Sequence, residues 1–235
     1  MRDYFVFDGI SSKDFGIYIA DGNVEDSPSR SVETYKIPGK NGTLTIDNGR
    51  FNNINLSYTV YADQNIVQNI SALRAALATK IGSLRLEDTR HPDEFRIARY
   101  SSGLKMKNFD KVSGAATITF DCNPQRFLKS GEDEITIPVG GMELLNPTLF
   151  GAKPLIKVLP TNTSAVVSVG AYNISIDFAG AWIEIDCETM NAYSGLVSRN
   201  GNVTIPDGTE IAPGAQNISL TNISNAIIIP RWWTI

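Results

Sequence analysis

Three carboxylates, Glu184, Asp186 and Glu188, alternate with apolar residues along one short segment. Alternate side chains of a β-strand share one face, so the three would lie side by side. Such a group could bind Ca²⁺, or Glu184 and Asp186 could act as the acid and base of a hydrolase. The spacing is not that of a Ca²⁺-binding loop, and the sequence offers no basic partner. We therefore interpret the segment as a charged, solvent-facing edge strand.

His91 is the only histidine, and it lies between Arg90 and Pro92 in a predicted turn. A catalytic histidine needs a nucleophile and an orienting acid, and the sequence places neither beside it. The chain has no P-loop, no dinucleotide-binding glycine pattern after a strand and no Cys/His metal spacing. The sequence therefore predicts a protein that is not an enzyme and uses no cofactor or metal ion.

Aromatic residues of the C-terminal half could stack on a sugar, namely Trp182, Trp232 and Trp233 with Tyr172 and Tyr193. In a β-sandwich such residues more often fill the core, in which case Trp182→Ala would be strongly destabilising. Trp232 and Trp233 must point to opposite sides if they lie in a strand. One of them is then buried, and the other is a candidate contact for a ligand or partner.

Composition limits the remaining functions. The 235 residues are 42% hydrophobic, enough for one large or two modest domains, and the net charge of −4 argues against general nucleic-acid binding or a membrane-surface protein. The N-terminus lacks the apolar region of a signal peptide, and no stretch of about 18 apolar residues could span a membrane. Cys122 and Cys187 lie in apolar strand contexts, which predicts buried free thiols in a reducing cytoplasm.

Apolar periodicity then defines the elements. Short alternating runs predict strands through most of residues 1–128, and one helix is predicted at about 64–81, with Asp63 as N-cap and Gly82 as C-terminal cap. The apolar stripe of that helix consists of Ile66, Ile70, Leu73, Leu77 and Ile81. A polar linker follows at 129–134. Strands then recur every 8–14 residues, as in a β-sandwich, at 135–139, 154–159, 165–169, 172–178, 181–187, 203–205, 217–221 and 226–231.

The most unusual segment is a glycine-rich ribbon within a predicted hairpin arm at about 32–61. Pro38-Gly39 and Asn41-Gly42 favour chain reversal, and Asn48-Gly49 suits a tight hairpin turn. With few apolar anchors, the ribbon cannot form a core and must lean on its own domain or on a neighbouring chain. The residues that we assign to contact between subunits are Ile37, Pro38, Gly39, Asn41, Gly42, Leu44, Ile46, Asn48 and Gly49.

Three collinear stretches together resemble the distal tail proteins of long-tailed, non-contractile bacteriophages of Gram-positive hosts. The first stretch is Phe5–Ile17 followed by Ile37–Gly42, and the second is Phe95–Phe127 with its ending Phe120-Asp121-Cys122-Asn123-Pro124. The third comprises Pro154–Val158, Ile183–Asp186 and Ile229–Trp232.

This resemblance implies a mainly β fold with an N-terminal ring-forming domain at 1–128, which carries the helix and the arm, and a galectin-like β-sandwich at 129–235. It also implies a hub of the phage tail tip or baseplate, in which six subunits form a ring whose channel lets DNA pass. The partners would be the tail tube protein, the tape-measure protein, and tail-associated lysin or receptor-binding baseplate proteins. The protein would be assembled in the host cytoplasm and located in the virion tail. The alternative is a carbohydrate-binding module that contacts host cell-wall polysaccharide.

Overall fold

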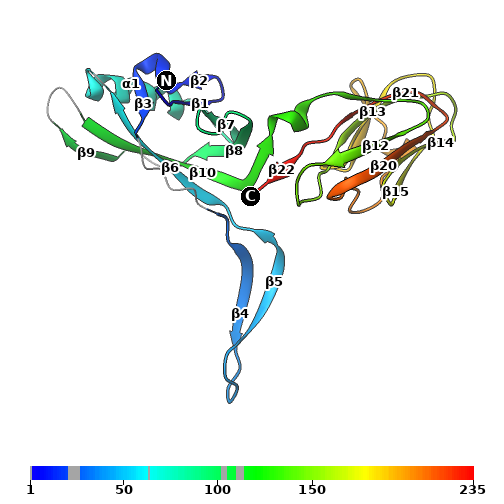
Figure 1. The fold of residues 1–235 in the computed structure, drawn as a ribbon, viewed down its shortest axis with the longest axis horizontal. Helices are drawn as coiled ribbons and strands as arrows, with labels where there is room; N and C mark the ends of the chain where they lie inside the picture. Colours follow the sequence, from blue (N-terminus) through cyan, green and yellow to red (C-terminus); the bar gives the residue numbers. More distant parts are fainter. Residues whose placement is uncertain (1, 21–26, 63, 102–104, 110–113) are drawn as a thin grey trace. The chain divides into compact units, whose positions relative to one another are not determined.

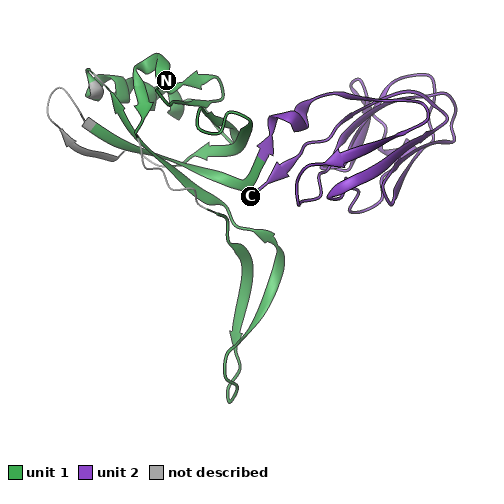
Figure 2. Cartoon of the chain, in the orientation of Figure 1, with its two compact units in different colours: residues 1–126, 235 green, residues 127–234 purple. Residues whose placement is uncertain are grey.

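The computed structural model describes residues 2–20, 27–62, 64–101, 105–109 and 114–235. The chain divides into two compact units, unit 1 with residues 1–126 and 235 and unit 2 with residues 127–234 (Figures 1 and 2). The division falls after Arg126, whereas we expect it after Leu128 from the sequence. We describe each unit by itself.

Unit 1 is organised around a sheet with the strand order β2-β1-β7-β8-β10-β6-β3, in which β10 also pairs with β9 and β22. The strands are β1 (Phe5–Phe7), β2 (Ile10–Ser11), β3 (Ile17–Ile19), β6 (Ile54–Ala62), β7 (Leu84–Asp88), β8 (Glu94–Tyr100), β9 (Lys105–Phe109) and β10 (Gly114–Leu128). The last two residues of β10 belong to unit 2, as does β22 (Trp233–Thr234). On the core face, the Phe5 ring stacks on Tyr58 and meets the edge of Phe120. Helix η1 (Ser12–Phe15) and helix α1 (Ile66–Ala78) adjoin this sheet.

Helix α1 buries Ile70, Leu73 and Leu77 in the core of unit 1, as the apolar stripe predicts. The predicted ends of the helix are wrong. Asn65 is the N-cap, with a φ of 50° and no side-chain capping bond, and Asp63 lies outside the described residues. The helix stops at Ala78, before the last turn of the predicted stripe, so Ile81 is left 89% exposed.

The arm is a two-stranded sheet of β4 (Arg30–Lys36) and β5 (Thr43–Phe51), separate from the main sheet of its unit. The predicted range of 32–61 is too long at its C-terminal end. Residues 54–62 form β6, which pairs with both β10 and β3. Alternating apolar residues predict strands both in the arm and at β6. They do not show that β6, unlike the arm, belongs to the core sheet of unit 1.

Unit 2 consists of two sheets, with strand orders β11-β21-β13-β16-β17-β18 and β12-β20-β14-β15-β19. The strands are β11 (Ile135–Ile137), β12 (Met142–Asn146), β13 (Leu155–Pro160), β14 (Ala165–Val169), β15 (Tyr172–Ile176), β16 (Ile183–Asp186), β17 (Asn191–Ser194), β18 (Val197–Ser198), β19 (Val203–Thr204), β20 (Gly214–Thr221) and β21 (Ile223–Ile229). A short helix, η3 (Asn200–Asn202), precedes β19. Alternate residues of β13 and β14 are buried in one apolar core. The mainly β fold class is therefore confirmed.

The predicted linker at 129–134 is partly structured, because Lys129–Glu132 forms helix η2 and docks on the last residues of unit 2. The Leu128 N–H donates to the Trp232 carbonyl at 2.9 Å, and the Arg231 N–H donates to the Gly131 carbonyl at 2.7 Å. A Cβ atom on Gly131 would lie 2.3 Å from the Trp232 nitrogen, so only glycine fits this close approach.

Candidate functional site

The turn of the arm lies at residues 37–42, where the Lys40 N–H donates to the Ile37 carbonyl at 3.2 Å. Gly39 and Gly42 have φ angles of 79° and 84°, and a Cβ atom added to either would meet nothing within 4 Å. Glycine is therefore required at both positions by the backbone conformation and not by close packing against a neighbouring group. Together with Ile37, Pro38 and Asn41, they form the exposed tip of the arm.

Asn48 and Gly49 do not form the predicted hairpin turn. They lie inside β5, where the pairing shifts between Arg30 and Val32, so the dipeptide forms a β-bulge. Gly49 supplies a φ of 71°, its N–H donates to the Asp47 carboxylate at 2.8 Å, and the Asn48 amide lies 3.4 Å from the Ser31 hydroxyl. Tight-turn residues also suit bulges, so the local pattern does not distinguish the two.

The pairing register gives the arm two different faces. Tyr35 lies opposite Leu44, and Glu33 opposite Ile46, so these four side chains share one face. Thr34 opposite Thr45 and Lys36 opposite Thr43 belong to the other face. We call the face formed by Tyr35, Leu44 and Ile46 the apolar arm face.

The apolar arm face is uncovered in the single chain. Tyr35, Leu44 and Ile46 are 49%, 45% and 48% exposed, and neither apolar core includes a residue of the arm. Within the described residues, β4 and β5 pair only with each other, so each has an open edge. The arm can therefore accept both an apolar surface and a β-strand. The predicted contact residues omit Tyr35, although the alternation of residues 32–37 was a usable signal.

The sheet of unit 1 carries hydroxyl groups on the face opposite its core. Ser57 pairs with Thr119 and Thr59 with Thr117 across β6 and β10, and the Ser57 and Thr119 hydroxyls are 2.8 Å apart. Arg99 on β8 donates to Asp121 on β10 at 2.9 Å. This hydroxyl face is therefore polar, with the Arg99 and Asp121 charges paired.

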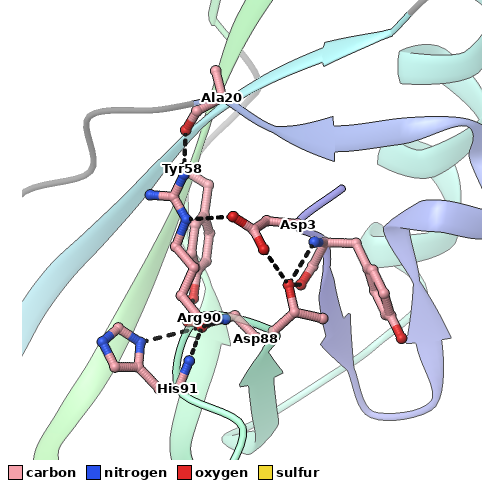
Figure 3. Close-up of polar contacts among 8 residues, drawn as sticks. Asp3, Ala20, Tyr58, Asp88, Arg90 and His91 are labelled. Carbon is pink, nitrogen blue, oxygen red and sulfur yellow. Dashed lines mark hydrogen bonds and ion pairs between the residues drawn. The ribbon is translucent and has the colours of Figure 1, made fainter. Parts of the chain in front are cut away.

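His91 belongs to a polar clamp at the end of β7 (Figure 3). One oxygen of Asp88 accepts from the backbone N–H groups of Arg90 and His91 at 2.9 Å and lies 3.1 Å from His91 Nδ1. The other oxygen accepts from the buried Tyr58 hydroxyl at 2.8 Å. Burial, followed by the Asp88 charge, raises the pKa of Tyr58 well above its ordinary value.

Arg90 extends the clamp to the N-terminus and to the end of β3. Its Nε donates to Asp3 at 3.1 Å, and its Nη2 donates to the Ala20 carbonyl at 2.9 Å. The bond from Arg90, with a second from Thr89, lowers the pKa of Asp3. These contacts fix the 88–91 turn against three segments, so the residues around His91 have a structural role.

Tyr58→Phe is expected to destabilise unit 1 by about 1.5–3 kcal/mol, because it removes a hydrogen bond to a carboxylate that burial shields. Urea denaturation of the full chain measures the loss. Tyr61→Phe, on the other face of β6, is the control and should change stability by less than about 0.5 kcal/mol. Equal effects of the two variants would contradict this role of the Asp88 bond.

The three alternating carboxylates do not form an edge strand. Residues 183–186 form β16, which lies between β13 and β17 inside the six-stranded sheet. Asp186 is 8% exposed and accepts two hydrogen bonds from Arg231, at 2.7 and 3.2 Å. Burial raises the pKa of Asp186, but the bonds from Arg231 and from the backbone of Glu188 and Thr189 outweigh burial, and the net pKa lies below its usual value.

The paired state of Asp186 makes it a structural residue. It is separated from Arg231 by 45 positions, so sequence spacing could not reveal the pair. Among the described residues, no group of three or more His, Cys, Asp or Glu side chains could hold a metal ion.

Comparison with known proteins rests on structure alone, because no family model and no curated protein matches the sequence. The fold matches a solved structure, the "Crystal Structure of SPP1 Dit (gp 19.1) Protein, a Paradigm of Hub Adsorption Apparatus in Gram-positive Infecting Phages". The TM-score is 0.80 over the whole of both chains, at 12% sequence identity. The chain has the Dit fold. The resemblance to distal tail proteins is confirmed at the level of the fold.

The candidate contacts Trp232 and Trp233 lie at the end of the Dit fold of this chain. Trp232 is 4% exposed and belongs to the core of unit 2. Trp233 stacks on Phe150 with ring centroids 4.4 Å apart, and its Nε1 donates to the Gly151 carbonyl at 2.8 Å. Both rings have intramolecular partners, whereas Trp182 is 43% exposed.

Trp182→Ala is expected to cost about 1–2 kcal/mol in unit 2, because Trp182 is already 43% exposed to water. Trp232→Ala, by contrast, removes a buried ring and should cost about 3–5 kcal/mol. Thermal unfolding of the two variants side by side measures the difference. A loss at Trp182 that equals the loss at Trp232 would contradict this assignment.

Each unit of the Dit fold contains one buried thiol. Cys122 is fully buried in unit 1, and Cys187 is 1% exposed in unit 2. Burial raises the pKa of Cys122 to about 11 and that of Cys187 to about 12. Both are free cysteines.

Among the described residues, no helix has the length and hydropathy to cross a membrane.

Proposed function

We propose that this protein is a structural, non-catalytic hub of a phage tail tip, in which six copies form a ring that joins the tail tube to the host-adsorption apparatus. The observation that carries the proposal is the uncovered apolar arm face on a chain with the Dit fold. SPP1 Dit, which shares that fold, is described as a paradigm of a hub adsorption apparatus in phages that infect Gram-positive hosts.

A ring needs a heterologous contact, in which one surface of each subunit meets a different surface of the next. The arm provides one such surface, since Tyr35, Leu44 and Ile46 lie on one face and its open edges can accept a strand. The exposed tip, from Ile37 to Gly42, extends the reach of this contact. We assign Ile37, Leu44 and Ile46, with Tyr35, as its apolar anchors.

The hydroxyl face of unit 1 is the surface that we assign to the channel. DNA must slide past this wall without being held, so free positive charge there would be unfavourable. On β6, β8 and β10, Ser57, Thr59, Thr117 and Thr119 bring none, and Arg99 is paired with Asp121, whereas the register of β9 sets Lys105 opposite Thr117 and Lys107 opposite Ala115. The assignment is therefore confined to β6, β8 and β10. The net charge of −4 is consistent with weak binding to phosphates.

The remaining partners follow from the position of a hub. The ring would contact the tail tube protein on one side and tail-associated lysin or receptor-binding baseplate proteins on the other, with the tape-measure protein at the channel. The protein would be located in the virion tail.

Native mass spectrometry and negative-stain imaging of the purified full chain, at tens of micromolar subunit, test the proposal. We expect a closed ring with a central opening, and six copies by mass. A monomer under these conditions, together with the absence of such a ring from assembled tails, would overturn it.

A further inference from the structure

Three asparagines of the chain are followed directly by glycine, namely Asn41, Asn48 and Asn200. Glycine has no Cβ atom, so its backbone nitrogen is unusually open to attack on the carboxamide carbon of the side chain before it. This reaction makes asparagine one of the thermolabile residues. All three asparagines are exposed to solvent, so exposure does not distinguish them. Their hydrogen bonds do distinguish them.

Asn41 lies at the tip of the arm, between β4 and β5, and is not held by the rest of the protein. Within the described residues, neither its carboxamide nor the Gly42 N–H makes a hydrogen bond. Gly42 has a φ of 84°, and a Cβ atom there would meet nothing within 4 Å. The carboxamide and the Gly42 nitrogen can therefore turn toward each other without breaking a bond.

Asn48 has the same following residue but is protected at the attacking nitrogen. The Gly49 N–H donates to the Asp47 carboxylate at 2.8 Å, and the Asn48 amide lies 3.4 Å from the Ser31 hydroxyl. A backbone nitrogen attacks only after it has lost its proton, and a carboxylate bonded to that N–H disfavours the loss. Attack at Asn48 also requires β5 to open locally, because both residues lie inside that strand.

Asn200 is protected at its side chain. Its Oδ1 accepts from the Ala192 N–H at 2.7 Å, and its Nδ2 donates to Asn191 Oδ1 at 2.9 Å. Both polar atoms of the carboxamide are therefore engaged. The carbon between them cannot turn toward the Gly201 nitrogen unless both bonds break.

We propose that Asn41 is a site of spontaneous deamidation in the free subunit, and that the bonds around Asn48 and Asn200 spare those two residues. The Gly42 nitrogen, after losing its proton to water, attacks the carboxamide carbon of Asn41. A C–N bond forms and closes a cyclic succinimide, and the amide nitrogen takes up a proton and leaves as ammonia. Water then opens the ring at either carbonyl, which gives an aspartate or an isoaspartate at position 41.

Both products change the arm tip. Each places a carboxylate next to Lys40 and lowers the net charge of −4 by one unit, and the isoaspartate also adds a methylene group to the main chain of the turn. Because we assign the tip to the ring contact, subunits modified before assembly should be depleted from rings. That consequence rests on the proposed hub role, whereas the deamidation itself does not.

Incubation of the purified full chain at neutral and mildly alkaline pH, followed by peptide mass mapping over time, tests the site. Each deamidation adds about 1 Da, and chromatography separates the aspartate and isoaspartate peptides. We expect Asn41 to react at least about tenfold faster than Asn48 or Asn200, since their hydrogen bonds must break first. The rate at Asn41 should rise with pH, because the attacking nitrogen must lose a proton.

Two variants test the protection directly. Asp47→Ala frees the Gly49 N–H and should speed deamidation of Asn48 by about tenfold. Asn191→Ala frees Asn200 Nδ2 and should likewise speed the reaction of Asn200. Neither change should alter the rate at Asn41, and Asn41→Gln should abolish the signal of the tip peptide. Melting temperatures confirm that each variant is folded during the incubation.

A variant with Leu44 and Ile46 replaced by threonine is incubated in parallel, because a ring contact would cover the tip in the original chain. A reaction at Asn41 that is slow in the original chain and fast in this variant supports both the deamidation and the ring contact. Equal, fast reaction in both samples supports the deamidation and contradicts a ring contact at the tip. The proposal is overturned if Asn41 in the threonine variant reacts no faster than Asn48 and Asn200.

Discussion

Replacing Leu44 and Ile46 together by threonine is expected to dissociate the ring into single subunits while leaving the melting temperatures of both units unchanged. Full burial of a large aliphatic side chain is worth about 1.5–3 kcal/mol. Because both side chains are nearly half exposed in the single chain, covering each should contribute roughly 1 kcal/mol. Two per arm amount to about a 30-fold change in each association constant, and a closed ring repeats that loss at every contact.

The opposite face of β5 provides the matched control for this experiment. Thr43→Ser with Thr45→Ser changes the same strand at the same distance from the tip, but on the face opposite the apolar arm face. Analytical ultracentrifugation should then show rings for the control and monomers for the Leu44/Ile46 variant. A drop in melting temperature for the latter would mean that the arm belongs to the core of its own subunit. Intact rings would mean that the apolar arm face is not the contact.

Arg231→Met is expected to destabilise unit 2 by about 2–4 kcal/mol at neutral pH, because it leaves the carboxylate of Asp186 buried without its partner. We take the lower part of the usual range because the Arg231 side chain is itself 32% exposed. Arg231 has a φ of 60°. Methionine bears the same backbone strain there, so the change isolates the ion pair.

The loss should depend on pH in a defined direction. The pKa of Asp186 is lowered in the folded protein, so its ion pair contributes fully above the unfolded value of about 3.9. That contribution disappears as the pH falls through the lowered pKa. The difference between the original protein and Arg231→Met should therefore be largest at neutral pH and shrink below about pH 4.

Lys153→Met is the control, since Lys153 and Glu188 are 3.7 Å apart and their side chains are 43% and 57% exposed. An exposed pair of this kind should contribute at most about 1 kcal/mol. Guanidinium denaturation between pH 3 and 7 measures both variants. A loss for Arg231→Met that does not change with pH, or that only matches Lys153→Met, would contradict the role of the Asp186 pair.

Local patterns predicted the strands and the helix because those elements follow the periodicity of their own residues. Alternation located β10, β13, β14 and β16, and the three-and-four spacing located α1. The same signals missed β12 and β17, whose runs are short and interrupted by polar residues.

The errors about burial share one cause, which is that distant partners decide which residues are covered. The resemblance predicted the Dit fold, but β6 alternates as the arm does, and only its pairing with β10 and β3 places it in the core. Trp182 has the large apolar ring typical of a core residue, yet it is 43% exposed. The amide of Asn200 in η3 bonds to Ala192 and Asn191 of β17, eight and nine positions away.

The two thiols make the stability of each unit measurable in one unmodified molecule. The chain has only Cys122 and Cys187, one per unit, and a buried thiol with a raised pKa reacts with a maleimide only when its surroundings open. The rate of maleimide reaction at each cysteine, resolved by peptide mass, therefore measures the rate at which one unit opens, independently of the other. The same measurement on assembled rings then shows in which unit assembly slows the opening, with no cysteine introduced into the chain.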